Sequence, residues 1–256
     1  MDNSLDVQNL CYLDILKNIS FTLKDKTFNV LVGRNGSGKS TLIKCLLGLF
    51  NYNGEVLYKN KKVDKIFNKI GYIYPDMFIE EGLVIDKIIE PITNLGTNKK
   101  NIKDKTFKIA KKLGIEYSLY KNTSELSKIE YKLIKLISQT ILDPEYIFID
   151  EDYSDLPFEI LEKVNSYIKK LSKSSIVLMT VLDDKYLMDA SNILFIDNGE
   201  LIGDGNISKY MENEKIFSKC NIKMPFILDI SSKLKSYNLI DQVYTDKIEL
   251  VDSIWK

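Results

Sequence analysis

One stretch of the sequence decides the fold: Gly33-Arg34-Asn35-Gly36-Ser37-Gly38-Lys39-Ser40-Thr41. It matches G-x-x-x-x-G-K-[ST], the pattern of a phosphate-binding loop. The apolar run Phe28–Val32 enters this loop as a predicted strand, and Ser40–Leu49 leaves it as a predicted helix. Glycine lets the backbone curl so that N–H groups point at phosphate oxygens, and the helix N-terminus adds positive charge. We therefore expect residues 33–41 to hold the phosphates of a nucleotide.

The polar side chains of this loop have predicted roles. Lys39 is expected to reach the β- and γ-phosphates as a catalytic residue, and the Ser40 hydroxyl is expected to bind Mg²⁺. The cofactors that the loop predicts are ATP and Mg²⁺. The other predicted nucleotide-binding residues of the loop are Gly33, Asn35, Gly36, Ser37, Gly38 and Thr41.

A second element completes the predicted site. Residues Tyr146–Ile149 form an apolar strand, and two carboxylates, Asp150 and Glu151, follow it directly. We expect Asp150 to hold Mg²⁺, directly or through water. We expect Glu151 to polarise an attacking water as a general base. Strands often end in a polar turn, so this pair of carboxylates alone would not indicate a site. It indicates one here because the same chain carries a phosphate-binding loop.

Composition and charge exclude several classes of protein. The 256 residues include 36 lysines and arginines against 36 aspartates and glutamates, and Arg34 is the only arginine. We expect no nucleic-acid partner, because phosphate neutralisation needs excess positive charge and bidentate base recognition relies on arginine. The sequence contains no histidine, which excludes Ser-His-Asp catalysis and histidine metal sites.

We expect neither a signal peptide nor a membrane span. The first ten residues lack a basic segment followed by an apolar run. The longest apolar runs, such as Ile176–Met179, are far shorter than the ~20 residues of a spanning helix. Cys11, Cys45 and Cys220 are widely spaced, which favours reduced thiols over metal ligands. Any association with a membrane therefore requires a partner protein.

Strand-like runs and helical segments alternate, which predicts an α/β fold with a mostly parallel sheet. The expected sheet strands are Phe28–Val32, Ile70–Tyr74, Tyr146–Ile149, Ile176–Thr180 and Ile193–Ile196. The expected helices are Ser40–Leu49, Ile102–Leu113, Ser127–Leu142 and Phe158–Leu171. A separate antiparallel β subdomain is expected from Leu5–Leu10, Ile19–Leu23 and Glu55–Tyr58.

Two further segments differ from this alternation. Residues from about 76 to 142 carry helical signals and little strand signal, which predicts a helical insert in the sheet domain. Residues 214–256 are predicted to form a small C-terminal helical appendage. In it, Pro225 opens the helix-like segment Phe226–Tyr237, and an amphipathic segment ends at Trp255.

With these motifs in place, residues 1–213 resemble an ABC-type ATPase, a P-loop NTPase. In that family a Leu-Ser-Gly-Gly-Gln signature begins a helix ahead of the carboxylate strand, and the matching segment is Leu126-Ser127-Lys128-Ile129-Glu130. The resemblance implies that Ser127 contacts the nucleotide held by the other subunit of a head-to-tail dimer, and that Tyr12 stacks on adenine. Ser127 and Glu130 also match a capping box, which favours a helix start there.

The chain departs from the family pattern at several positions. Lys128 and Ile129 replace the signature glycines, Pro75 stands where glutamine is usual, and Val181 stands where a histidine contacts the γ-phosphate. Residues 152–157 also differ from the usual segment after the catalytic glutamate. These changes leave the phosphate-binding loop intact and predict weak hydrolysis by the isolated chain.

Three segments narrow the resemblance to the ATPases of energy-coupling-factor transporters. They are Asn94-Leu95-Gly96, Asn221-Ile222-Lys223-Met224-Pro225 and Thr245–Val251. Such ATPases place a small dimerisation domain, here residues 214–256, after the ATP-binding domain, here residues 1–213, and power uptake of vitamins or metal ions. The implied partners are a second ABC ATPase subunit, in a homodimer or heterodimer, and a transmembrane subunit. The implied location is the cytoplasmic face of the cell membrane.

The resemblance also predicts where the membrane partner docks. In the family, the segment after position 75 lines a groove that receives a short helix of the transmembrane subunit. Here residues 76–81 join Met77 and Phe78 to three carboxylates, Asp76, Glu80 and Glu81. This composition fits an acidic acceptor with an apolar floor. A solvated loop in which Met77 and Phe78 pack on the insert is the alternative.

Other interpretations of the whole chain stay open. It could be a subunit of a conventional ABC importer or exporter. It could also be a catalytically impaired subunit that partners an intact ABC ATPase, which the altered residues 126–130 and the missing glutamine and histidine favour. A small-molecule kinase with a P-loop is disfavoured, because that class does not account for Leu126-Ser127 or the long insert.

Overall fold

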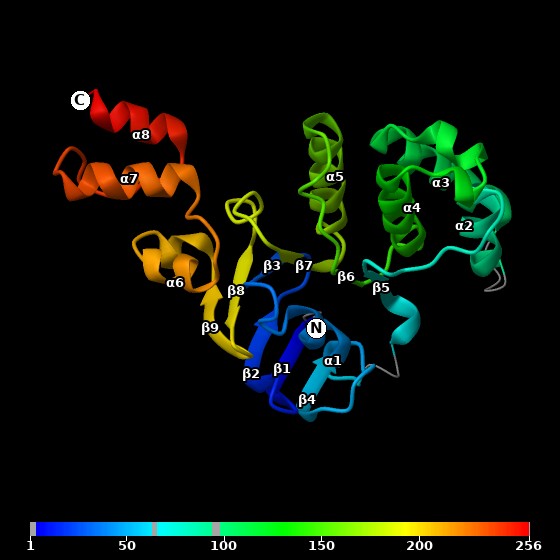
Figure 1. Cartoon of the computed structure of the whole chain (residues 1–256), viewed down its shortest axis with the longest axis horizontal. Coiled ribbons are helices and arrows are strands. Elements are labelled where there is room, and N and C mark those ends of the chain that lie inside the picture. Colours follow the sequence, from blue (N-terminus) through cyan, green and yellow to red (C-terminus); the bar gives the residue numbers. More distant parts are fainter. Residues whose placement is uncertain (1–3, 63–65, 94–97, 256) are drawn as a thin grey trace. The chain divides into compact units, whose positions relative to one another are not determined.

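The computed structural model describes residues 4–62, 66–93 and 98–255, and the chain divides into two compact units (Figure 1). Unit 1 contains Met1–Phe67 and Leu178–Lys256, and unit 2 contains Asn68–Val177. The segment Asn94-Leu95-Gly96, which was used for the narrower resemblance, lies outside the described residues. The predicted division into 1–213 and 214–256 stays a prediction.

Unit 1 begins with an antiparallel sheet in the order β2-β1-β4. Its strands are β1 (Leu5–Tyr12), β2 (Leu16–Leu23) and β4 (Asn53–Tyr58). Leu5 pairs with Leu23 on one side and with Tyr58 on the other, and all three side chains are buried. Apolar residues on one face and polar residues on the other are what a half-buried antiparallel sheet requires. The antiparallel subdomain is therefore confirmed.

The second sheet of unit 1 carries the phosphate-binding loop. Strand β3 (Phe28–Val32) is buried along its whole length and runs parallel to β8 (Asn192–Asp197), as a central parallel strand requires. Helix α1 (Lys39–Leu46) follows β3 after the loop. Strand β9 (Glu200–Gly205), which the sequence analysis missed, is antiparallel to β8.

Strand β9 forms because of the turn that precedes it. Asn198 and Gly199 both have positive φ, at 49° and 78°, as a two-residue hairpin turn demands. Two glycines within β9, Gly203 and Gly205, interrupt its apolar pattern, so the hydrophobic periodicity did not indicate a strand there. The Asn-Gly pair was the signal that could have revealed it.

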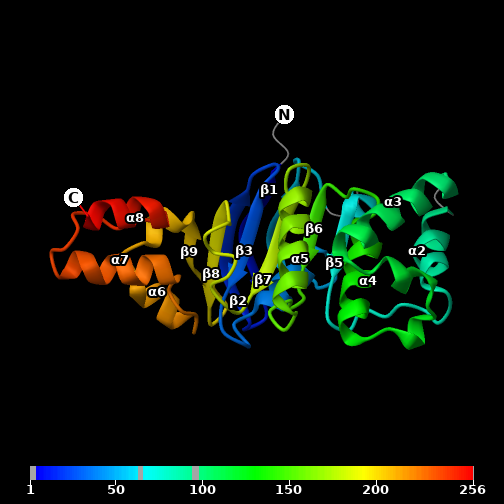
Figure 2. The same ribbon diagram turned by 90° about the horizontal axis from the view of Figure 1, so that it is seen from above.

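The C-terminal part of unit 1 is helical, as expected. It contains α6 (Glu214–Lys219), α7 (Phe226–Ser236) and α8 (Lys247–Ile254). Helices α7 and α8 lie side by side (Figure 2). The N–H of Tyr244, in the loop that precedes α8, donates to Ser231 Oγ of α7 at 2.7 Å. The Phe195 ring of β8 packs edge-on against Tyr210 and Phe217, which joins this segment to the sheet.

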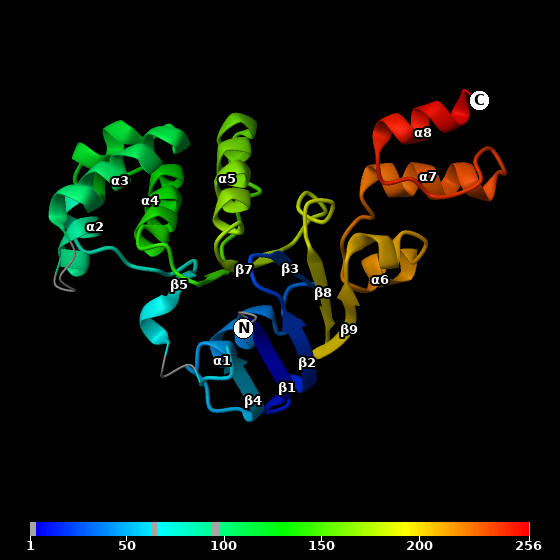
Figure 3. The same cartoon turned by 180° about the vertical axis from the view of Figure 1, so that it is seen from behind.

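Unit 2 combines a parallel strand pair with the helical insert (Figure 3). Strands β5 (Ile70–Ile73) and β6 (Tyr146–Ile149) pair in parallel, with Ile73 opposite Ile149. The helices are α2 (Val84–Thr93), α3 (Lys99–Leu113), α4 (Lys128–Thr140) and α5 (Phe158–Leu171). Strand β7 (Ile176–Val181) crosses the boundary between the units.

These elements confirm the predicted α/β fold, with parallel pairs in both units and one antiparallel strand beside β8. Cys11, Cys45 and Cys220 are free, and burial raises the pKa of Cys45 and of Cys220 to about 11, so both thiols stay protonated at neutral pH. Within the part of the chain that the structure describes, no helix combines the length and apolar character needed to cross a bilayer.

Candidate functional site

The loop between β3 and α1 has the backbone shape of a phosphate cradle. Gly36 and Gly38 have φ of 78° and 106°, a region that side chains other than glycine rarely adopt. A Cβ on Gly33 would collide with Ile196 O and Ser37 Oγ, and one on Gly38 would lie 2.8 Å from Leu16 Cδ2. The three predicted glycines are therefore required by the geometry of the loop itself.

The lysine of the loop lies inside this cradle. Lys39 begins α1, is 9% exposed, and its Nζ donates to Gly33 O at 2.6 Å and to Arg34 O at 3.0 Å. The ammonium is thus held where the loop curls. The Arg34 side chain turns away to the β8–β9 turn, where it pairs with Asp197 at 3.1 Å and donates to Asn198 at 2.6 Å.

The residues present fit a triphosphate. Gly38 caps α1 without a side chain, and no side-chain cap bond is formed at this helix start. Ser37 Oγ is buried and has no hydrogen-bond partner among the described residues. Ser40, Asn35 and Gly36 are exposed. Unused N–H groups, a buried lysine and an unpaired hydroxyl at a helix N-terminus are the donors that a phosphate group requires.

Tyr12, the predicted adenine contact, lies at the end of β1 in the same unit. Its ring stacks on Phe50, with centroids 4.9 Å apart and planes 8° from parallel, and Lys44 lies over the Phe50 ring. Tyr12 is partly exposed. A stacked aromatic pair beside α1 is compatible with base stacking, and the adenine contact stays a prediction.

The predicted carboxylates lie in unit 2, at the end of β6. Asp150 is 9% exposed, and its N–H donates to Ile73 O at 2.8 Å. Burial, with the Asp150 carboxylate and Tyr74 nearby, raises the pKa of Tyr72, so the phenol stays neutral. No group of three or more metal-ligating side chains occurs among the described residues. A carboxylate is a ligand that Mg²⁺ prefers, and the contact of Asp150 with the ion stays a prediction.

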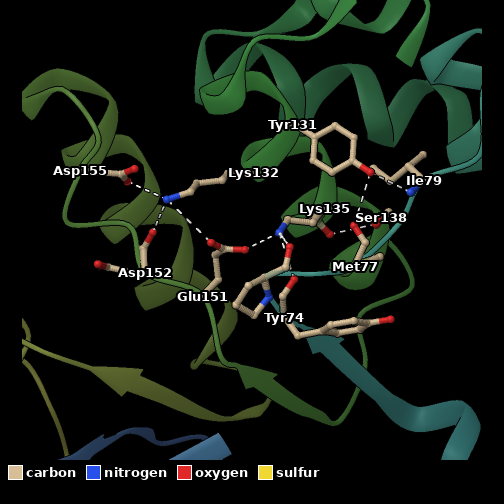
Figure 4. Close-up of polar contacts among 11 residues, drawn as sticks. Tyr74, Met77, Ile79, Tyr131, Lys132, Lys135, Ser138, Glu151, Asp152 and Asp155 are labelled. Atoms are coloured by element: carbon tan, nitrogen blue, oxygen red, sulfur yellow. Dashed lines mark hydrogen bonds and ion pairs between the residues drawn. The ribbon is translucent and has the colours of Figure 1, made fainter. Parts of the chain in front are cut away.

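Glu151 has two lysine neighbours that the sequence analysis missed (Figure 4). Its Oε2 forms an ion pair with Lys135, and its Oε1 lies 3.7 Å from the Nζ of Lys132. Both lysines project from α4. The available signal was a lysine at position 135 between apolar pairs, Leu133-Ile134 and Leu136-Ile137, where a charge must be buried.

The altered signature segment forms a well-capped helix start. Ser127 Oγ accepts from the Glu130 N–H at 3.2 Å, and Glu130 accepts from the Ser127 N–H at 2.8 Å, so the predicted capping box is present. Burial raises the pKa of Glu130, but hydrogen bonds from Lys121, Ser118 and Ser127 outweigh it and lower the pKa to about 2. Ser127 itself is exposed at the helix N-terminus.

Comparison with known proteins agrees with this geometry. The family model described as ABC transporter matches residues 16–154. The chain belongs to the ABC transporter family. It is an ATP-binding subunit of such a transporter, of the ABC ATPase type. Nucleotide binding by this family explains the loop at 33–41, and the predicted family membership is confirmed.

Two bacterial relatives of this ABC ATPase match it along almost the whole chain. The energy-coupling factor transporter ATP-binding protein EcfA1 of Mesomycoplasma hyopneumoniae is 30% identical, over 94% of this chain and 91% of that protein. The EcfA1 of Mycoplasmopsis synoviae is also 30% identical, over 94% of this chain and 93% of that protein. The narrower resemblance is thus supported by full-length relatives.

A solved structure shares the fold of this ABC ATPase. CbiO1 of Clostridium perfringens, described as part of the ABC transporter complex cbiONQ, has a TM-score of 0.72 and is 23% identical. The match covers 90% of this chain and 99% of that protein.

Proposed function

We propose that this ABC ATPase powers an energy-coupling-factor type transporter that takes up a vitamin or a metal ion. The proposal is supported by the two EcfA1 relatives, which this chain covers over more than nine-tenths of their length. It places the chain at the cytoplasmic face of the membrane. The observation that carries the nucleotide-binding part is the glycine cradle around Lys39.

The loop and α1 bind the phosphates in this proposal. Backbone N–H groups of residues 33–41 and the positive N-terminus of α1 contact the phosphate oxygens. Lys39 exchanges its two carbonyl acceptors for the β- and γ-phosphates, which are stronger acceptors because they are charged. Tyr12 stacks on the adenine ring.

Ser40 and Asp150 hold Mg²⁺ in this proposal. When bound, the ion neutralises charge on the phosphate oxygens. Ser127 of the opposite subunit in a head-to-tail dimer contributes its hydroxyl and its helix N-terminus to the γ-phosphate. Glu151 accepts the proton of the attacking water.

The proposed partners are a second ABC ATPase subunit and a transmembrane subunit. A cavity of about 500 Å³ beside α2 has an apolar floor that includes Met77, Ile88 and Ile92, and carries Glu80 and Glu90. A basic helix of the membrane partner suits this cavity. Lys87 already pairs with Glu80 at 3.3 Å and with Glu90 at 3.7 Å, so the partner's cation would compete with Lys87.

Of the three carboxylates predicted to receive the partner, only Glu80 lines this cavity, so this proposal takes Glu80 together with Glu90 as the acceptor. Phe78, which lines the cavity, is 77% exposed and offers a further apolar contact.

The test of the proposal is ATP binding that depends on Lys39. Lys39 is the only lysine of the loop, and Lys39→Ala removes its positive charge from the phosphates. We expect this variant to bind Mg²⁺–ATP at least ~100-fold more weakly, because about two charge-assisted hydrogen bonds are lost. Isothermal titration calorimetry measures the affinity. Lys24→Ala, which removes an exposed charge in the same unit, is the matched control and should bind as the wild type does. Equal affinity in all three proteins would overturn the proposal.

A further inference from the structure

Lys135 is an unusual residue for the middle of α4. Its side chain is 3% exposed and lies in a helix face that is otherwise apolar. Its Nζ donates to Tyr74 O at 2.9 Å, to Pro75 O at 2.9 Å and to Glu151 Oε2 (Figure 4). A lysine ammonium has three protons, so these three acceptors satisfy it completely. Such a fully bonded buried cation has one defined position.

Two of the three contacts fix the ammonium independently of Glu151. The carbonyls of Tyr74 and Pro75 follow β5 directly and belong to the backbone, so they cannot follow a moving side chain. The same helix holds the next part of this segment through Tyr131, whose hydroxyl accepts from the Ile79 N–H at 2.9 Å and donates to Met77 O at 3.4 Å. Lys135 is therefore anchored to the backbone on one side and to the carboxylate on the other.

The other oxygen of Glu151 faces a second lysine. Lys132 lies 3.7 Å from Oε1, is 17% exposed, and is itself held by Asp152 O at 2.6 Å and Asp155 Oδ1 at 2.7 Å. The Glu151 carboxylate is 6% exposed. The carboxylate at the general-base position is thus buried and paired on both oxygens.

This arrangement opposes the chemistry expected of a general base. A general base must turn its carboxylate toward the attacking water, whereas both oxygens of Glu151 face lysines. Rotation of Glu151 toward a water molecule would break the ion pair with Lys135. The orientation of the carboxylate is therefore restrained by Lys135.

We propose that Lys135 is a positioning residue that locks Glu151 in an ion pair and thereby slows ATP hydrolysis at this chain's own site. The inference rests on the proposed role of Glu151 in hydrolysis. None of Lys135, Tyr74, Pro75 and Glu151 belongs to the phosphate-binding loop at residues 33–41. The lock should therefore affect turnover and leave nucleotide affinity unchanged.

The test is steady-state hydrolysis of Mg²⁺–ATP by the full chain with Lys135→Met, which keeps most of the length of the side chain and removes its charge. We expect kcat to rise about tenfold or more. This rise would recover part of the rate acceleration of about 10²–10⁴-fold that a general base typically supplies. KM should stay within about twofold of the wild type, since no loop contact changes. Adding Glu151→Gln to this variant should abolish the gain, which shows that the gain acts through the carboxylate.

Two controls separate a lock from a merely structural effect. Lys135→Arg keeps the charge and should retain the low kcat. Lys103→Met makes the same substitution at an exposed position of α3 and should leave both kcat and KM unchanged. If Lys135→Met does not fold, Lys135→Gln keeps N–H donors for the two carbonyls without the charge, and the same rise in kcat is expected.

The outcomes distinguish the two proposals. A kcat that is unchanged or lower in the neutral variant, with ATP still bound, would overturn the lock and leave the proposed function standing. Failure of the wild-type chain to bind ATP would overturn the proposed function itself. A rise in kcat that survives Glu151→Gln would also contradict the lock, because the gain would then come from another group.

Discussion

The phosphate-binding loop and the carboxylate strand differ in how they are built. The loop is mainly backbone: three glycines, a helix N-terminus and one lysine that bonds to carbonyls of the loop. The carboxylate Glu151 is held by side chains of α4, which lie outside its own motif. The difference indicates that nucleotide binding is encoded locally, whereas the state of the carboxylate proposed to be catalytic depends on residues elsewhere in unit 2.

The largest effect is expected from breaking the ion pair of the carboxylate region. Lys135→Met leaves Glu151 buried with Lys132 as its remaining cation, so we expect the free energy of unfolding to fall by about 3–5 kcal/mol. Glu151→Met should cost a similar amount, because it strands the ammonium. The double variant should recover most of the loss, since a buried pair replaced by apolar groups is often neutral.

Urea denaturation of the wild type and these three variants measures the coupling between the two sites. If the loss of unfolding free energy in the double variant equals the sum of the two single losses, Lys135 and Glu151 do not act as a pair. The contrast between the phosphate-binding loop and the carboxylate region would then not hold.

A smaller effect is expected at Glu130, where the chain departs from the family signature. The folded pKa of about 2 lies below the unfolded value of 4.5, so the stabilisation from this carboxylate is present above about pH 4.5. It is lost as the pH falls from about 4.5 toward 2, because protonation removes the charge that strengthens the hydrogen bonds from Lys121, Ser118 and Ser127.

Thermal unfolding between pH 7 and pH 3 checks this prediction. On acidification, the melting temperature of the wild type should fall further than the melting temperature of Glu130→Gln, because the glutamine amide does not titrate. Parallel pH profiles of the two proteins would contradict the role of Glu130. This test sharpens the comparison, because the capping box stabilises the start of the helix that also carries Lys135.

Much of the fold was predictable because it is locally encoded. The strands Phe28–Val32 and Tyr146–Ile149 were predicted to the residue, since the second is a continuous apolar run and the first is interrupted only by Asn29. The capping box at Ser127 was predicted from two residues three apart. Strand β9 was missed because its glycines erase the alternation, although the Asn198-Gly199 turn before it carried a usable signal.

The site divides in the same way. The loop residues needed only the motif and its flanking strand and helix, which are adjacent in the chain. The contact between Lys135 and Glu151 joins residues 16 positions apart, through the packing of α4 near the end of β6. The sequence predicted a helix over Ser127–Leu142, but it could not reveal which acceptors surround a buried lysine within that helix.

One measurement tests the central claim that this chain binds ATP in the loop while its catalytic carboxylate is locked. The wild-type chain, in excess over radiolabelled Mg²⁺–ATP, is followed for both the bound and the hydrolysed fraction over time. We predict rapid, near-complete binding with a hydrolysis rate constant roughly a hundredfold below the ~10 s⁻¹ of a median enzyme. Hydrolysis of bound ATP at the ordinary enzymatic rate, abolished by Glu151→Gln, would contradict the account.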